Sequence, residues 1–171
     1  QRFNNDYKVE NFFKVPEPLI QEQFSRIMSL KDGLKKMSKS DASDLSRINL
    51  KDSNDSIINK IKKAKTDANP IPSNIEELEN RPEAENLIGI YSNLKNQNIE
   101  VTLKEFGGKN FSEFKNNLSE QLIDKISPIA GEINKLLNNS DYLDKILLTG
   151  AEKANEIAEK KVKEIKKIVG F

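Results

Sequence analysis

The chain has 171 residues, 32% of them charged, and contains no His, Cys or Trp. These absences exclude an imidazole general base, a Ser-His-Asp or Cys-His nucleophile, a zinc site with His or Cys ligands and a disulfide framework. The net charge of +1 gives no general attraction to nucleic acid or membrane, so any site for a polyanion must be a local cluster. Because no apolar run approaches the length of a membrane span, we expect a soluble, cytoplasmic protein with no membrane partner.

Residues 1–50 have the pattern of a β-containing segment. Asn11–Val15 is a short aromatic and β-branched run, and Phe24–Leu30 alternates apolar and polar residues, with Asp32-Gly33 as its turn signal. Both runs predict strands. Since two short strands do not form a stable sheet alone, we expect this segment to belong to a larger sheet whose other strands lie elsewhere.

From about residue 52 the apolar period becomes helical. Residues 53–66 form an amphipathic pattern after the cap candidates Asp52 and Ser53, and residues 67–82 form a linker. The lysines on the flanks of this predicted helix are Lys60, Lys62, Lys63 and Lys65. Pro82 suits the first position of the next helix, and a short helix over 99–106 should end at Gly107-Gly108.

The rest of the chain predicts three more helices. Apolar residues spaced by three and four from Phe111 to Leu136 indicate one long helix, bent at Pro128, and a short helix follows over 141–148. Thr149-Gly150-Ala151-Glu152 is a capping-box pattern that should begin the last helix, to about residue 169. The sequence thus predicts a mainly α chain, with about 120 residues in a helical bundle attached to a β-containing segment.

A lysine cluster is the feature most relevant to function. Lys31, Lys35, Lys36 and Lys39 crowd a predicted loop that follows a strand and contains a Gly and Ser residues. Ammonium groups, hydroxyls and backbone N–H groups at such a loop suit polyphosphate. By composition alone, a solvated surface turn is the stronger interpretation.

The order of the residues favours the phosphate interpretation. Lys36-Met37-Ser38-Lys39-Ser40 resembles the second signature loop of class I aminoacyl-tRNA synthetases. Further segments resemble the bacterial tryptophanyl-tRNA synthetases over essentially the whole chain: Arg26–Leu30, Asp44–Ile48, Arg81–Leu87 with Ile90-Tyr91, Phe106–Gly108 and Gly150–Ala154.

The resemblance implies a fold and a role for each part of the chain. Residues 1–50, with the signature loop at 36–40, would be the C-terminal part of a Rossmann-type catalytic domain that is incomplete in this chain. Residues 51–171 would be the helical anticodon-binding region, with the last helix, about 150–169, packing back toward the catalytic domain. The chain begins at Gln1 and lacks the His-containing first signature of this class, so we expect it to be the C-terminal half of the enzyme and inactive alone.

The resemblance also implies site residues and ligands. Lys39, and secondly Lys36, would be the catalytic contacts to ATP phosphates; Ser38 and Ser40 would donate to phosphate oxygens or hold the loop, while Met37 would pack. Ile27 and Met28 would lie beside the adenine. The substrates would be ATP with Mg²⁺, tryptophan and tRNA(Trp), with no tightly bound protein metal and a homodimeric full-length protein.

Several alternatives stay open at this point. The chain could be the corresponding part of a tyrosyl-tRNA synthetase, which shares the signature loop, or a non-catalytic tRNA-binding helical module that retains a vestigial loop. For the anticodon region, Lys60, Lys63 and Lys65 are candidate phosphate contacts and Tyr142 is a candidate for base stacking. Each of these residues suits a solvated surface or a structural position better.

Overall fold

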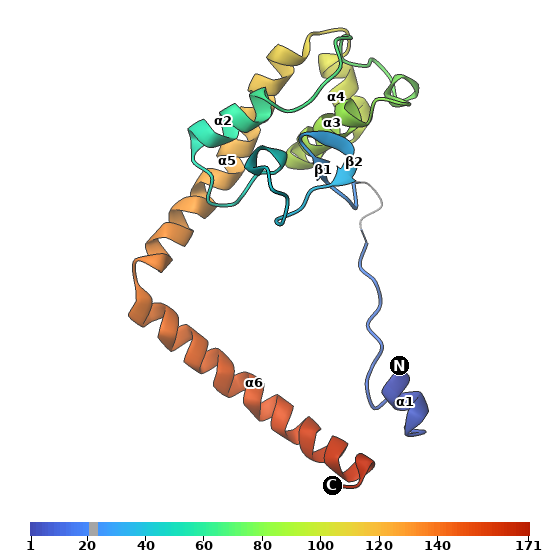
Figure 1. Ribbon diagram of the computed structural model, residues 1–171, viewed down its shortest axis with the longest axis vertical. Helices are drawn as coiled ribbons and strands as arrows, with labels where there is room; N and C mark the ends of the chain where they lie inside the picture. The colour runs from blue at the N-terminus through green and yellow to red at the C-terminus, as the bar shows by residue number, and fades with distance from the viewer. Residues whose placement is uncertain (21–23) are drawn as a thin grey trace. The chain divides into compact units, whose positions relative to one another are not determined.

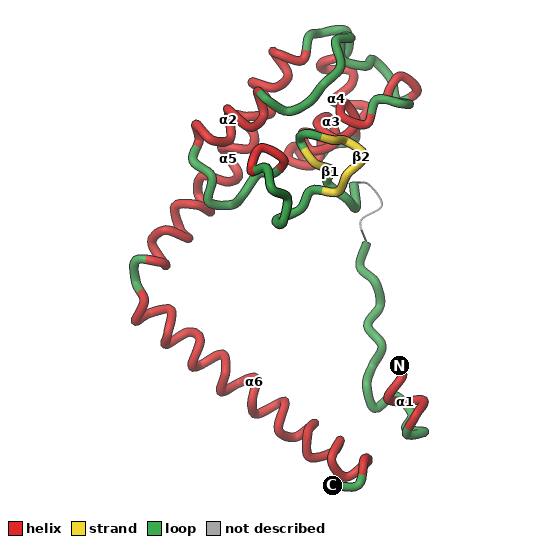
Figure 2. Tube along the Cα trace, in the orientation of Figure 1, coloured by secondary structure: helices red, strands yellow, loops and turns green. Residues whose placement is uncertain are grey.

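The protein is mainly helical with one small sheet, as its computed structural model, which describes residues 1–20 and 24–171, shows (Figures 1 and 2). The predicted mainly α fold class is confirmed at this level. Two compact units divide the chain, one made of Gln1–Ile20 with Lys135–Phe171 and the other of Gln21–Asn134. The functional boundary expected at residue 50 stays a prediction. Within the described part of the chain, no helix has both the length and the apolar character that a membrane crossing requires.

The strand expected at Asn11–Val15 is wrong. Asn11 adopts a left-handed backbone with φ of 51°, which interrupts an extended run. The Phe13 backbone N–H and C=O bond the side-chain amide of Asn4, at 3.0 and 2.8 Å, so a side chain takes the place of a neighbouring strand. Asn4 lies in the short helix α1 (Arg2–Asp6).

The last two predicted helices are one continuous helix, α6 (Ser140–Val169). It begins after Asn139, whose side chain accepts a hydrogen bond from the Tyr142 N–H. The helix start expected at Thr149 is therefore wrong. A Thr and a Glu three residues apart can also occupy successive turns inside a helix, and Gly150 between them lowers helix propensity without stopping the helix.

The sheet is an antiparallel hairpin of β1 (Met28–Ser29) and β2 (Asp32–Lys36). The strand expected over Phe24–Leu30 is thus only two residues long, and the lysines expected in a loop are partly on β2. The turn falls at Leu30-Lys31, before the expected Asp32-Gly33. Leu30 fixes this position because it is buried, and its backbone N–H and C=O bond the backbones of two distant segments at 2.9 and 2.7 Å.

In the described chain, four α-helices lie between the hairpin and α6: α2 (Asn54–Lys62), α3 (Pro82–Lys95), α4 (Ile99–Phe106) and α5 (Phe111–Leu137). The bounds predicted for α4 and the position of Pro82 at the start of α3 are confirmed. Ser53 is the cap of α2, accepting from the Ser56 N–H at 3.2 Å, although α2 ends before the expected residue 66. After α4 the left-handed residue is Gly108, with φ of 77°. Helix α5 continues through Pro128, and the bend expected there stays a prediction.

The core of the larger unit lies between α3, α4 and α5. The rings of Tyr91, Phe106 and Phe114 pack with centroids 5.0 to 5.4 Å apart, a range typical of aromatic pairs in protein cores. Arg81, at the start of α3, ties the preceding linker to this body. Its guanidinium donates to both carboxylate oxygens of Asp67, at 2.8 and 2.9 Å, and to the Pro70 C=O at 2.9 Å.

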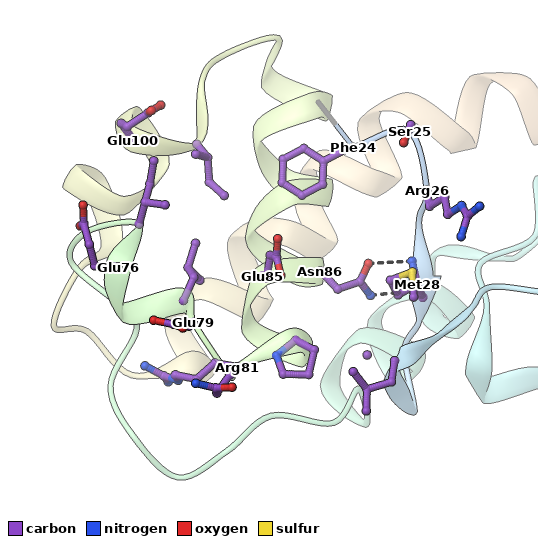
Figure 3. Close-up of a pocket in the computed structure, with 17 residues that line it drawn as sticks. Phe24, Ser25, Arg26, Met28, Glu76, Glu79, Arg81, Glu85, Asn86 and Glu100 are labelled. Atoms are coloured by element: carbon purple, nitrogen blue, oxygen red, sulfur yellow. Dashed lines mark hydrogen bonds between the residues drawn. The ribbon is translucent and has the colours of Figure 1, made fainter. Parts of the chain in front are cut away.

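The hairpin contacts α3 at two places. One contact requires a glycine on β2, and the other uses a side-chain amide from α3. A Cβ at Gly33 would lie 2.6 Å from the Glu83 backbone N, so β2 can approach the start of α3 only with glycine at this position. On the other strand, the Met28 N–H donates to the Asn86 Oδ1 and the Met28 C=O accepts from the Asn86 Nδ2, both at 2.9 Å (Figure 3). Asn86 is only 5% exposed. Its amide therefore satisfies the free edge of β1 as a neighbouring strand would.

Replacing Asn86 with Leu should destabilise the unit that contains the hairpin and α3. The substitution leaves the Met28 N–H and C=O without partners, and each unsatisfied backbone group costs about 1–3 kcal/mol. We expect a loss of about 2 kcal/mol or more in the free energy of unfolding, measured by urea denaturation. Asn93→Ala, on the exposed part of the same helix, is the control and should change that value by less than about 0.5 kcal/mol. Equal losses in the two variants would contradict the assigned role of Asn86.

Candidate functional site: the signature loop

The signature loop, residues 36–40, extends from the end of β2. Lys36 is the last residue of the strand and pairs with Met28 across the hairpin, while Lys39 lies in the turn at the loop tip. Both lysines are exposed, and neither has an ion-pair partner among the residues that the structure describes. Their ammonium groups are therefore available to an anionic ligand.

The serines of the loop bond to each other. The Ser38 and Ser40 hydroxyl oxygens lie 3.0 Å apart, and the Ser40 N–H donates to the Ser38 Oγ at 3.3 Å. The Asp41 N–H closes the turn on the Ser38 C=O at 3.4 Å. These bonds shape a turn around Lys39, and both hydroxyls remain on an exposed surface where they can also donate to a phosphate oxygen.

The first end of the loop is fixed to β1. The Met37 N–H donates to the Ile27 C=O at 3.0 Å, and the half-buried Met37 side chain packs on the hydrophobic core. Ile27 and Met37 both line an apolar pocket of about 300 Å³, whose other walls include Leu94 of α3 and Leu122 of α5. The two residues expected near an adenine, Ile27 and Met28, are thus next to the loop, and both backbone groups of Met28 are already bonded to Asn86.

The second end of the loop is fixed by Arg47. Its Nη1 donates to the Asp41 C=O at 3.0 Å, directly after the loop. The same guanidinium is oriented by two neighbours: its Nη2 lies 3.1 Å from the Asp44 carboxylate, and its Nε donates to the Asn49 side chain at 3.2 Å. The Arg47 side chain is 18% exposed, so it is largely shielded from water.

A buried lysine from α2 supports this arrangement. The Lys60 side chain is 2% exposed, and its Nζ lies 2.7 Å from the Asp44 carboxylate and 2.6 Å from that of Asp52. The hydrogen bond from Lys60, followed by that from Asn49, holds the pKa of Asp44 below its ordinary value of 3.8. Asp44 therefore stays ionised near neutral pH, and its carboxylate forms ion pairs with both Lys60 and Arg47.

The lysines considered for tRNA phosphate contacts have different surroundings. Lys60 cannot serve this purpose, because it is buried between two carboxylates. The Lys65 ammonium lies 2.6 Å from the Glu83 carboxylate, and this hydrogen bond raises the pKa of Lys65. Lys63 and Tyr142 are exposed, and their proposed contacts stay predictions.

A large cavity lies elsewhere in the described part of the chain. It has a volume of about 1030 Å³ and lies between the hairpin, α3 and the 3₁₀-helix η2 (Glu76–Leu78) (Figure 3). Its described lining includes Arg26 and Met28 but no residue of the signature loop. The lysine chemistry is therefore on an open surface next to the hairpin, where an extended ligand such as a nucleotide polyphosphate can reach it.

Comparison with known proteins assigns the family. A family model described as "tRNA synthetases class I (W and Y)" matches residues 1–126. The chain belongs to this family. The match extends from the N-terminal segment through the signature loop into α5, so the resemblance to class I synthetases is confirmed. Of the accompanying segments, Gly150–Ala154 lies beyond the matched residues.

Curated relatives of this class I synthetase chain include several tryptophan–tRNA ligases. A tryptophan–tRNA ligase from Brucella melitensis is 45% identical over 100% of this chain and 53% of its own length. Another, from Agrobacterium fabrum, is 51% identical over 97% of this chain and 47% of its own length. The chain thus spans about half the length of the curated relatives it matches.

Solved structures show the same fold. A tryptophanyl-tRNA synthetase from Mycoplasma pneumoniae aligns with a TM-score of 0.81 at 23% identity, over 99% of this chain and 50% of that one. A Campylobacter jejuni tryptophanyl-tRNA synthetase, complexed with ADP and tryptophan, aligns with a TM-score of 0.65 at 24% identity over the same shares. At these identities the likeness establishes the fold alone.

The synthetase fold brings the predicted site residues together on one hairpin, with Ile27 and Met28 at β1 and residues 36–40 at and beyond the end of β2. The sequence patterns assigned no role to Asn86 or Arg47. Asn86 holds β1 through Met28, and Arg47 holds the end of the signature loop through Asp41. The patterns also placed Lys60 on a solvated flank. A local signal was present, because Lys60 lies three residues after the buried Ile57, on the apolar stripe of α2.

Replacing Lys60 with Met should cost about 3 kcal/mol of stability, because it leaves Asp52, 10% exposed, without its cation. The free energy of unfolding from urea denaturation measures the effect. Lys62→Met is the matched control, since Lys62 is exposed on the same helix, and should cost less than about 0.5 kcal/mol. If Lys60→Met were as stable as the control, the ion pair would not be holding α2 to the segment after the loop.

Proposed function

We propose that this chain is the C-terminal half of a tryptophan–tRNA ligase and supplies its ATP-phosphate loop and its helical tRNA-recognition region. The observation that carries the proposal is the signature loop of a class I synthetase with two exposed lysines, Lys36 and Lys39, which have no ion-pair partner among the described residues. The tryptophan specificity rests on the names of the curated relatives, since the pocket for the amino acid is expected outside this chain. Those names favour tryptophan over the tyrosine alternative.

The proposed reaction has two steps. The tryptophan carboxylate attacks the α-phosphorus of ATP, a new acyl–phosphate bond forms, and the bond to the β-phosphate breaks to release pyrophosphate. A terminal ribose hydroxyl of tRNA(Trp) then attacks the acyl carbon, and AMP leaves. The first nucleophile is already an anion, so this step requires positioning and charge stabilisation more than proton transfer. Lysine ammonium groups provide that stabilisation, which agrees with a chain that has no histidine.

Each residue of the hairpin has a proposed role. Lys39 stabilises the charge that builds on the leaving pyrophosphate, and Lys36 holds the phosphates from the strand end. Ser38 and Ser40 donate to phosphate oxygens or maintain the turn. Ile27, Met28 and Met37 form the apolar side of the adenine site. Mg²⁺ enters with ATP as part of the substrate complex, bound through phosphate oxygens.

The remaining parts of the chain have proposed roles at a coarser level. Residues 1–50 complete a Rossmann-type catalytic domain, and residues 51–171 form the anticodon-binding region, with α6 packing back toward the catalytic domain. The complete enzyme acts as a cytoplasmic homodimer, and this chain alone does not form adenylate. These assignments follow from family membership together with the helical content of the second segment.

Lys39→Ala in the full-length synthetase should lower kcat for tryptophan-dependent ATP–pyrophosphate exchange by about 100-fold. The Michaelis constant for ATP should rise much less, because the proposed contact strengthens in the transition state. Lys51→Ala removes an exposed lysine beyond the loop and should leave kcat within about twofold of the parent enzyme. An unchanged kcat in Lys39→Ala would contradict the role proposed for this lysine.

A further inference from the structure

The signature loop is tethered at one residue on each side of its exposed tip. On the first side, Met37 is bonded to β1, and its side chain packs into the core. On the second side, the Arg47 guanidinium donates to the Asp41 C=O at 3.0 Å, and the Asp41 side chain accepts a local hydrogen bond from the Ser43 N–H at 2.8 Å. Among the described residues, the Arg47 bond is the one that holds the Asp41 backbone from outside the loop. Between them, Ser38 to Ser40 are exposed and bond only to one another or to the next residue, among the interactions that the structure describes.

We propose that Arg47 is a positioning residue for adenylate formation, acting through the C-terminal tether of the signature loop. The inference rests on the proposed function, since it concerns where Lys39 is held. It assigns to Arg47 a role in the chemistry without any contact to substrate: the guanidinium fixes the Asp41 backbone two residues after Lys39.

The surroundings of Arg47 suit a fixed support better than a ligand-binding side chain. Its guanidinium is engaged with Asp41, Asp44 and Asn49, and Nη1 is also 3.4 Å from the Ser43 C=O. These contacts use all three guanidinium nitrogens in a nearly buried position. Asp44 is itself bonded to the buried Lys60 at 2.7 Å. The loop is therefore connected to α2 through Arg47, Asp44 and Lys60, and each of these charged side chains helps to orient the next.

The position of the Lys39 backbone determines where its ammonium group can act. Lysine side chains are long and flexible, so the backbone position of Lys39 sets the range over which its ammonium group can reach a phosphate. A displacement of about 1 Å at a reacting centre can cost about 100-fold in rate. Loss of the second tether would let residues 38–41 sample other positions, and the chemical step would slow more than ATP binding weakens.

The chain offers a matched control for Arg47. Arg81 is 17% exposed, against 18% for Arg47, and it also bonds one aspartate, Asp67, and the backbone C=O groups of Asn69 and Pro70. It holds the linker before α3 and has no contact with the signature loop among the described residues. Arg81→Met therefore removes a similar set of bonds at a similar burial, away from the proposed chemistry.

The test measures ATP–pyrophosphate exchange in the full-length synthetase. Arg47→Met should lower kcat by about 10-fold or more while the Michaelis constant for tryptophan stays within about twofold. Arg47→Lys keeps a cation beside Asp44 and should recover part of kcat. Arg81→Met should leave kcat within about twofold. If Arg47→Met keeps kcat within twofold, or Arg81→Met loses as much, the proposal is overturned.

A double-mutant cycle tests whether Arg47 acts through Lys39. In a Lys39→Ala background, Arg47→Met should lower kcat by much less than it does in the parent enzyme, because the group that it positions is gone. Full additivity of the two losses would overturn the action through Lys39. An unaffected Lys39→Ala single variant would instead refute the proposed role of that lysine, and Arg47 would then be judged on its comparison with Arg81 alone. For any variant too unstable to assay, faster amide exchange at residues 38–41 than in Arg81→Met supports the tether, and equal exchange overturns it.

Discussion

An isolated two-stranded hairpin is marginally stable in water, and the synthetase chain places its signature loop on such a hairpin. The helices supply the contacts that further strands provide in a larger sheet. The Asn86 amide bonds both backbone groups of Met28, and the contact at Gly33 brings β2 against the start of α3. The position of the loop is therefore determined by α3 as much as by β1 and β2.

The same helical body holds the far side of the loop by charge. Lys60 of α2 lies buried against Asp44 and Asp52, and Asp44 in turn orients Arg47. A rigid base with an exposed, lysine-bearing tip suits chemistry in which charge on a leaving group must be stabilised without proton transfer. The proposed function therefore requires no histidine or cysteine from this chain.

Local patterns predicted the elements whose ends are determined locally. The Pro82 start of α3, the Ser53 cap of α2 and the span of α4 all follow from the residues at those positions. Predictions failed where distant groups decide, as at Asn11–Val15, where a side-chain amide replaces a strand. The α6 prediction failed for another reason, since the Thr149 to Glu152 pattern is compatible with both a helix start and a helix interior.

The signature loop could be recognised from the sequence, but the residues that hold it in place could not. The order Lys36 to Ser40 is contiguous, so it can be recognised from sequence. Asn86 and Met28 are 58 positions apart, and nothing local to either residue indicates the other. The burial of Lys60 could have been predicted, although it was not. A lysine on the apolar stripe of a helix requires a buried acidic partner, and Asp44 and Asp52 are close to it in the sequence.

The central claim is that the hairpin, with the base of the signature loop, is part of the same cooperative structure as the helices. Native-state hydrogen exchange at the Met28 and Met37 amides, compared with the core of α3 at Ile88 and Tyr91, tests it most directly. The account predicts that all four amides exchange with similar opening free energies, through unfolding of the whole unit. Exchange of Met28 and Met37 through a much less costly local opening, while α3 stays protected, would contradict it.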